Sequence, residues 1–132
     1  MTNPSESETT PATILVDVQL QRTDAGEHDA SLQELRQLIE TLGWKIAGTL
    51  TQKMSSLTAA SLIGPGKLEE LSALVKASPE VDSVVFDHDL TTTQVRNIRE
   101  TTEVDVYDRP AIILAIFYRH ARTKEAQLQV EL

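Results

Sequence analysis

The sequence predicts an α/β domain with a four-stranded parallel sheet flanked by helices, followed by the start of a long helix. Strand-like segments alternate with helical segments in the order β-α-β-α-β-α-β-α. A connection of helix length separates each strand from the next, as parallel pairing requires. The third strand segment is apolar without alternation, which is typical of a strand buried on both faces. A chain of 132 residues is sufficient for one such domain around one core.

The first third of the chain predicts a tail, a strand and a helix. Residues 1–12 are rich in Pro, Ser, Thr and Glu and bury too little apolar surface to offset their ordering entropy, so we expect a disordered tail. Residues 13–20 (TILVDVQL) are β-branched and apolar and predict the first strand. After a polar connection at residues 21–29, residues 31–42 repeat Leu and Ile at helical spacing, and Gly43 is expected to end that helix.

The middle of the chain predicts a second strand and helix and a third strand. Residues 44–52 (WKIAGTLTQ) alternate, and a long connection rich in Ser, Thr and Gly follows. Residues 66–77 place Leu and Val on one helical face, and Pro79 is expected to end that helix because it disfavours helical geometry at the preceding residue. Residues 82–87 (DSVVFD) predict the third strand.

The last third predicts a helix at residues 91–101, a strand at 104–107 and a strongly apolar helix at 110–121 that begins with Pro. We therefore place the α/β domain at residues 13–121. Residues 122–132 are interpreted as the start of a truncated long helix, because that segment ends on an apolar residue with nothing to cap it. Its apolar stripe would favour self-association; the alternative is a frayed helix that lies on the sheet.

The composition excludes several classes of protein. No apolar run approaches the roughly 20 residues of a membrane span, and the N-terminal residues lack the apolar centre of a signal peptide. Without Cys there is neither a disulfide framework nor a thiolate metal site. Together these features indicate a cytoplasmic protein without a membrane partner.

The charge is unevenly distributed. The net charge of −8 opposes general nucleic-acid affinity, but residues 91–132 carry 6 Lys/Arg against 6 Asp/Glu. Any surface that contacts RNA is therefore expected in this part, through Arg side chains suited to phosphate. The alternative is that these cations are solvated helix faces. The candidates are Arg96, Arg99, Arg109, Arg119 and Arg122.

The segment Gly64-Pro65-Gly66-Lys67 precedes a helix and could offer backbone N–H groups and a Lys to a phosphate. It departs from a P-loop, because Ser61 stands where the first Gly is required and Leu68 replaces the Ser/Thr that would hold magnesium. The segment is thus a weak nucleotide-binding candidate through Gly64, Gly66 and Lys67, and a tight turn is the alternative.

The segment Asp87-His88-Asp89 follows the third strand at the edge where open α/β sheets bind ligands. Two carboxylates and an imidazole could bind a metal or perform acid–base work. However, Asp89 is also placed to cap the next helix, and neither His28 nor His120 extends a ligand set in sequence. We therefore expect no metal site, and no nucleophile motif indicates catalytic residues.

An ordered series of motifs resembles the N-terminal domain of the HflX family of ribosome-associated GTPases. One is residues 63–71 (IGPGKLEEL), which is similar to the family's Gly-x-Gly-Lys-x-Glu-Glu-Leu signature. A second is Phe86-Asp87 followed by Leu90 and by residues 94–98. The densest match lies between residues 106 and 132 and includes the final LQVEL. The resemblance covers about residues 13–132.

The resemblance implies an α/β subdomain, two long antiparallel helices and then a P-loop GTPase domain. It implies binding to the large ribosomal subunit and its rRNA, and contact with the GTPase domain of the full-length protein. Because the sequence ends just inside the first long helix, GTP hydrolysis is not expected from this chain, and GTP and magnesium are expected only in the missing GTPase domain. Two alternatives stay open: an ATP-binding domain that uses the loop at residues 64–67, and a fragment without function.

Overall fold

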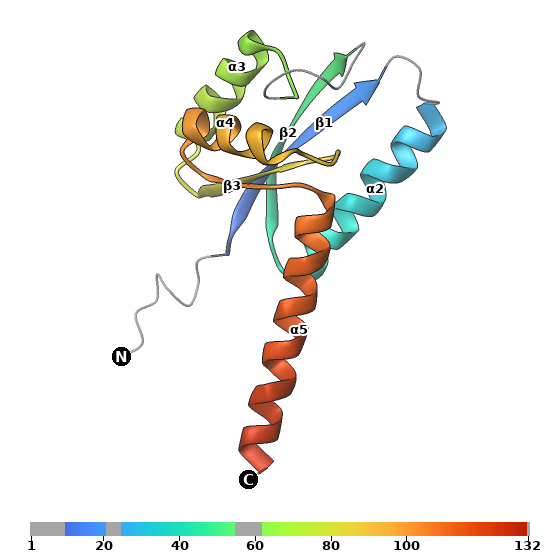
Figure 1. The fold of residues 1–132 in the computed structure, drawn as a ribbon, viewed down its shortest axis with the longest axis vertical. Helices are drawn as coiled ribbons and strands as arrows, with labels where there is room; N and C mark the ends of the chain where they lie inside the picture. The colour runs from blue at the N-terminus through green and yellow to red at the C-terminus, as the bar shows by residue number, and fades with distance from the viewer. Residues whose placement is uncertain (1–9, 21–24, 55–61, 132) are drawn as a thin grey trace.

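Figure 1 shows the fold as a computed structural model, which describes residues 10–20, 25–54 and 62–131. Four strands alternate with four helices, as the sequence predicts. The elements in chain order are β1 (Ala12–Leu20), α2 (Ala25–Thr41), β2 (Lys45–Met54), α3 (Pro65–Lys76), β3 (Val81–Phe86), α4 (Thr92–Thr102), β4 (Asp105–Tyr107) and α5 (Arg109–Glu131).

The four strands form one sheet in the order β2-β1-β3-β4, and every neighbouring pair is parallel. The predicted parallel sheet is thus confirmed. β1 and β3 lie in the middle, and the chain leaves them in opposite directions, β1 toward β2 and β3 toward β4. In open α/β sheets, the carboxyl ends of two such strands border the crevice in which ligands bind.

Helices cover both faces of the sheet, and each face has its own apolar core. Helices α3 and α4 pack on one face, where Ile14, Phe86 and Ile98 are fully buried. Helices α2 and α5 pack on the other face, where Leu15 and Ile112 are fully buried. Along β1 the side chains alternate between these two cores because successive side chains of a strand point to opposite faces. No helix among the described residues has the length and apolarity of a membrane span.

The structure corrects the predicted start of the first helix. Helix α2 begins at Ala25 and includes residues that we interpreted as a polar connection. The first turn was missed because its inward position is occupied by His28, a buried polar residue, which lies four positions before Leu32 and seven before Leu35. A polar residue on the core side of a helix hides the apolar periodicity on which the prediction depended.

The structure also joins the last two predicted helices into one. Helix α5 runs from Arg109 to Glu131 without interruption, and Figure 1 shows it extending well beyond the sheet. Residues 111–131 contain neither Gly nor Pro, so no residue in this range breaks the helix. The predicted tail at residues 1–12 extends too far, because Ala12 is the first residue of β1 and is buried, while residues 1–9 lie outside the described residues. The apolar stripe expected at Leu128 and Leu132 lies outside the described side chains.

The turn after α2 depends on Gly43. Its φ of +81° is strained for any residue with a Cβ, and a Cβ there would lie 3.3 Å from the Arg119 guanidinium. That guanidinium donates to the carbonyls of Thr41 and Leu42 at the end of α2.

We expect Gly43→Ala to lower the free energy of unfolding by about 1–2 kcal/mol, because the left-handed conformation disfavours a side chain. Urea denaturation measures this loss. Gly48→Ala is the matched control, since a Cβ at Gly48 meets nothing within 4 Å and its φ is ordinary. Equal losses in the two variants would contradict the role of the turn.

Candidate functional site

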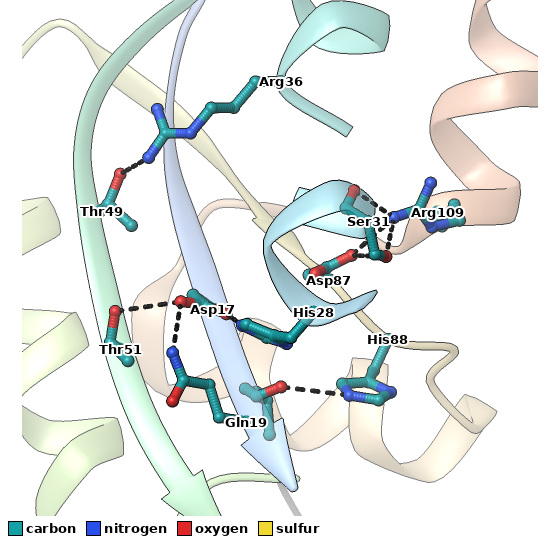
Figure 2. A network of polar contacts seen from close by, with 11 residues as sticks. Asp17, Gln19, His28, Ser31, Arg36, Thr49, Thr51, Asp87, His88 and Arg109 are labelled. Atoms are coloured by element: carbon teal, nitrogen blue, oxygen red, sulfur yellow. Dashed lines mark hydrogen bonds and ion pairs between the residues drawn. The ribbon is translucent and has the colours of Figure 1, made fainter. Parts of the chain in front are cut away.

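A cluster of polar side chains, three of them buried and one half-buried, occupies the carboxyl edge of the sheet, between the ends of β1 and β3 (Figure 2). Asp17 comes from β1, His28 from the first turn of α2, Asp87 from the residue after β3, and Arg109 from the start of α5. The cluster lies on the sheet face that α2 and α5 cover. It therefore stands at the position where this topology places a ligand site.

Asp17 is held by donors from two strands. It is only 3% exposed, and its Oδ2 accepts hydrogen bonds from Thr51 Oγ1 and Gln19 Nε2, both at 3.3 Å. Its Oδ1 is in close contact with His28 Nε2. One carboxylate oxygen thus orients the side chain, and the other is directed at the imidazole.

Asp87 is held by Arg109. The residue is 5% exposed, and its Oδ1 accepts from Arg109 Nη2 at 2.8 Å and from Ser31 Oγ at 3.5 Å. The same Nη2 donates to the Ser31 carbonyl at 2.7 Å, while Nη1 faces Glu34 Oε1 at 3.4 Å. Arg109 therefore links α2, α5 and the end of β3. The sequence analysis names Arg109 as a candidate RNA contact, whereas the structure places its guanidinium in an ion pair within the chain.

Of the two helix caps next to the cluster, the one expected at Asp89 is wrong and the one at Asp108 is present. Asp89 is exposed, and α4 is capped by Thr91 in a reciprocal capping box with Gln94. Asp108 accepts from the Ala111 N–H in the first turn of α5, as a cap does, and from the Leu90 N–H. Asp87-His88-Asp89 is therefore not a convergent set.

The sequence analysis missed two residues of this cluster, Asp17 and His28, and the latter was set aside because it lies far from Asp87 in sequence. His28 is 11 residues from Asp17 and 59 from Asp87 in sequence, and the fold brings all three together. His88 lies at the same edge, but its Nε2 contacts the Val18 carbonyl at 3.1 Å. The available signal was Asp17 itself, the acidic residue in the middle of a largely apolar strand.

The weak nucleotide-binding candidate lies on the opposite face of the sheet. The Gly64 N–H donates to Gln52 Oε1 at 3.1 Å, and Lys67 Nζ lies 3.5 Å from Glu70 Oε2. Gly66 is exposed at the start of α3. Both the Gly64 donor and the Lys67 ammonium thus have partners within the chain.

The five candidate arginines do not form one surface. Arg96 and Arg99 are exposed on α4, whereas Arg122 is exposed on α5, which covers the other face of the sheet. Arg119 donates to the carbonyl end of α2, and Arg109 belongs to the buried cluster. Two of the five therefore have structural partners, and three present their side chains to solvent.

Helix α5 carries the largest exposed apolar side chains. Phe117 is 72% exposed and Tyr118 is 63% exposed. A hollow of about 450 Å³ runs along the start of the helix and is lined by Arg109, Pro110, Ile113, Leu114 and Phe117. The helix thus combines aromatic side chains with the exposed cations Arg122 and Lys124.

Tyr107 ends β4 at the same edge of the sheet, where its ring packs edge-on against Trp44 at a centroid distance of 5.0 Å. Burial raises the pKa of the Tyr107 phenol above 10, and the carboxylates of Asp105 and Asp82 raise it further. The phenol is therefore neutral at physiological pH and provides packing rather than charge.

Comparisons with known proteins agree with this fold. The model of the family described as "GTP-binding GTPase N-terminal" matches residues 29–118. The GTPase HflX of Gluconacetobacter diazotrophicus is 37% identical over 92% of this chain, and that of Caldanaerobacter subterraneus is 42% identical over 80%. The chain spans only 35% and 24% of these two relatives. The crystal structure of an SsGBP–GDP complex superposes with a TM-score of 0.65 at 24% identity, covering 92% of this chain and 33% of the other.

Proposed function

Because the chain belongs to the HflX family of GTPases and corresponds to their N-terminal domain, we propose that it associates with the large ribosomal subunit through contacts to ribosomal RNA. In this proposal the domain serves to bind the large ribosomal subunit. Binding of GTP and magnesium, and hydrolysis, belong to the GTPase domain of the family. The relatives are named as GTPases, and the chain covers about a third of their length or less.

The observation that carries the proposal is the charge of helix α5. Residues 110–124 contain three cations and neither Asp nor Glu, in a chain whose net charge is −8. Arg122 and Lys124 are exposed and are the proposed phosphate contacts. The neighbouring Phe117 and Tyr118 offer exposed rings on which unpaired bases can stack. Arg96 and Arg99, exposed on α4, are proposed as a second and separate contact.

The runner-up is nucleotide binding by the loop at Gly64, Gly66 and Lys67. It is less favoured because the Gly64 N–H already donates to Gln52 and the Lys67 ammonium faces Glu70. A phosphate would have to displace both partners.

We expect Arg122→Ala/Lys124→Ala to reduce the fraction of the chain that sediments with large ribosomal subunits at low salt, and Arg96→Ala/Arg99→Ala to reduce it as well. Log affinity falls as log salt rises, and each lost phosphate contact should make this negative slope shallower by roughly 1. Sedimentation at several salt concentrations measures both quantities.

Lys45→Ala/Lys76→Ala is the matched control, because it removes two exposed cations outside the proposed contacts. The control should sediment like the unmodified chain. If the α5 double variant also keeps its affinity and salt slope, the proposed contact through α5 is wrong.

A further inference from the structure

We propose that Asp17, His28 and Asp87 form a binding site for a divalent transition-metal cation of the Zn²⁺ or Mn²⁺ class. Each residue offers one ligand atom, and these three atoms all lie within 4.8 Å of one another. The three residues are 3%, 8% and 5% exposed, so the site is built inside the fold. It is separate from the α4 and α5 cations of the proposed RNA contact, and either proposal can fail without the other.

Two buried atoms point to a ligand. Asp17 Oδ1 and His28 Nε2 have no hydrogen bond of acceptable geometry among the described residues, although they face each other closely. Buried polar atoms without hydrogen bonds are uncommon, and a role in binding an ion is one recognised reason for them. A cation ligated by both atoms would satisfy both, and it requires His28 and Asp17 to move apart from their present direct contact.

The surrounding side chains orient the ligands as the outer partners of a metal site do. Thr51 and Gln19 hold Asp17 through Oδ2 and leave Oδ1 directed at the imidazole. Arg109 and Ser31 hold Asp87 through Oδ1. Each carboxylate is thus positioned through one oxygen, which leaves its other oxygen for the cation.

The charges of the cluster also favour a dication. Asp17 and Asp87 contribute two buried carboxylates and Arg109 one guanidinium, whose other partner, Glu34, is 69% exposed. The buried carboxylates thus outnumber the guanidinium, and a bound cation offsets the excess negative charge. An imidazole beside two carboxylates suits Zn²⁺ or Mn²⁺ better than Mg²⁺ or Ca²⁺, which prefer oxygen ligands throughout.

The test is calorimetric titration of the chelator-treated 132-residue chain with Zn²⁺, Mn²⁺ or Mg²⁺. We expect saturable binding of one Zn²⁺ or Mn²⁺ and much weaker binding of Mg²⁺. His28→Gln should weaken the affinity at least tenfold, and Thr51→Val, which removes one outer hydrogen bond, about tenfold. His120→Gln is the matched control, because His120 is exposed on α5, and it should bind as the unmodified chain does.

A second measurement does not require the His28 variant to fold. The chain has three His residues, and on adding Zn²⁺ the imidazole nitrogen resonances of His28 alone should shift in the unmodified chain, with His88→Gln and His120→Gln supplying the assignment. A shift at His88 or His120 in place of His28, no saturable binding, or Mg²⁺ binding as tight as Zn²⁺ would each overturn the proposal. The cluster would then be two buried pairs, Asp17–His28 and Asp87–Arg109, that hold α2 and α5 to the sheet.

Discussion

Arg109→Ala is expected to lower the free energy of unfolding by about 3 kcal/mol. The variant removes the guanidinium 2.8 Å from Asp87 and leaves that carboxylate, whose side chain is 2% exposed, without its charged partner. Removing one member of a buried ion pair typically costs about 3–5 kcal/mol. The lower end applies here because the Arg109 side chain is itself 22% exposed. Urea denaturation of the chelator-treated chain measures the change.

Two companion variants separate the ion pair from general effects of losing an arginine. Arg122→Ala removes an exposed cation of the same helix and should change the free energy of unfolding by less than about 0.5 kcal/mol. In Asp87→Asn/Arg109→Ala the buried carboxylate is gone as well, so the double variant should lose less than the sum of the two single losses. Strictly additive losses would show that Asp87 and Arg109 do not depend on each other.

The parallel sheet was predictable from the sequence because its signals are local. The short apolar runs and the helix-length connections between them leave few alternatives to parallel crossovers. The start of α2 was not predictable in this way, since the buried residue of its first turn is His28, which hydrophobic periodicity does not count. Continuous helix through residues 111–131 was visible in the absence of Gly and Pro, and we divided it only because its apolar character falls after residue 121.

The buried cluster was less predictable than the fold. Asp87 was identified from its place after the third strand, because the end of a parallel strand is a local feature of the sequence. The partners of Asp87 could not be identified in this way. Asp17, His28 and Arg109 come close to Asp87 only when the crossovers bring β1, α2 and α5 to one edge of the sheet. The same limit applies to the arginines, because a list of cations does not show that Arg109 and Arg119 have internal partners while Arg96 is exposed.

Ile112→Ala is expected to lower the free energy of unfolding by about 2–5 kcal/mol, whereas Ile113→Ala should cost less than about 1 kcal/mol. The two residues are neighbours in α5, so both substitutions change helix propensity equally, and the difference between them isolates packing. Ile112 is fully buried in the core beneath α2 and α5, while Ile113 is 51% exposed beside the apolar hollow. Thermal or urea denaturation of the two variants, side by side, checks the expectation.

The contrast between Ile112 and Ile113 also tests which face of α5 packs on the core and which face is available to a partner. If the inner face holds the helix on the sheet and the outer face is available for binding, Ile113→Ala should leave the stability nearly unchanged and alter only association with a partner. Equal losses of stability would mean that the Ile113 side chain is covered in solution. The exposed face of α5 would then be smaller near its start than the structure indicates, while the contact proposed at Phe117, Tyr118 and Arg122 would stand.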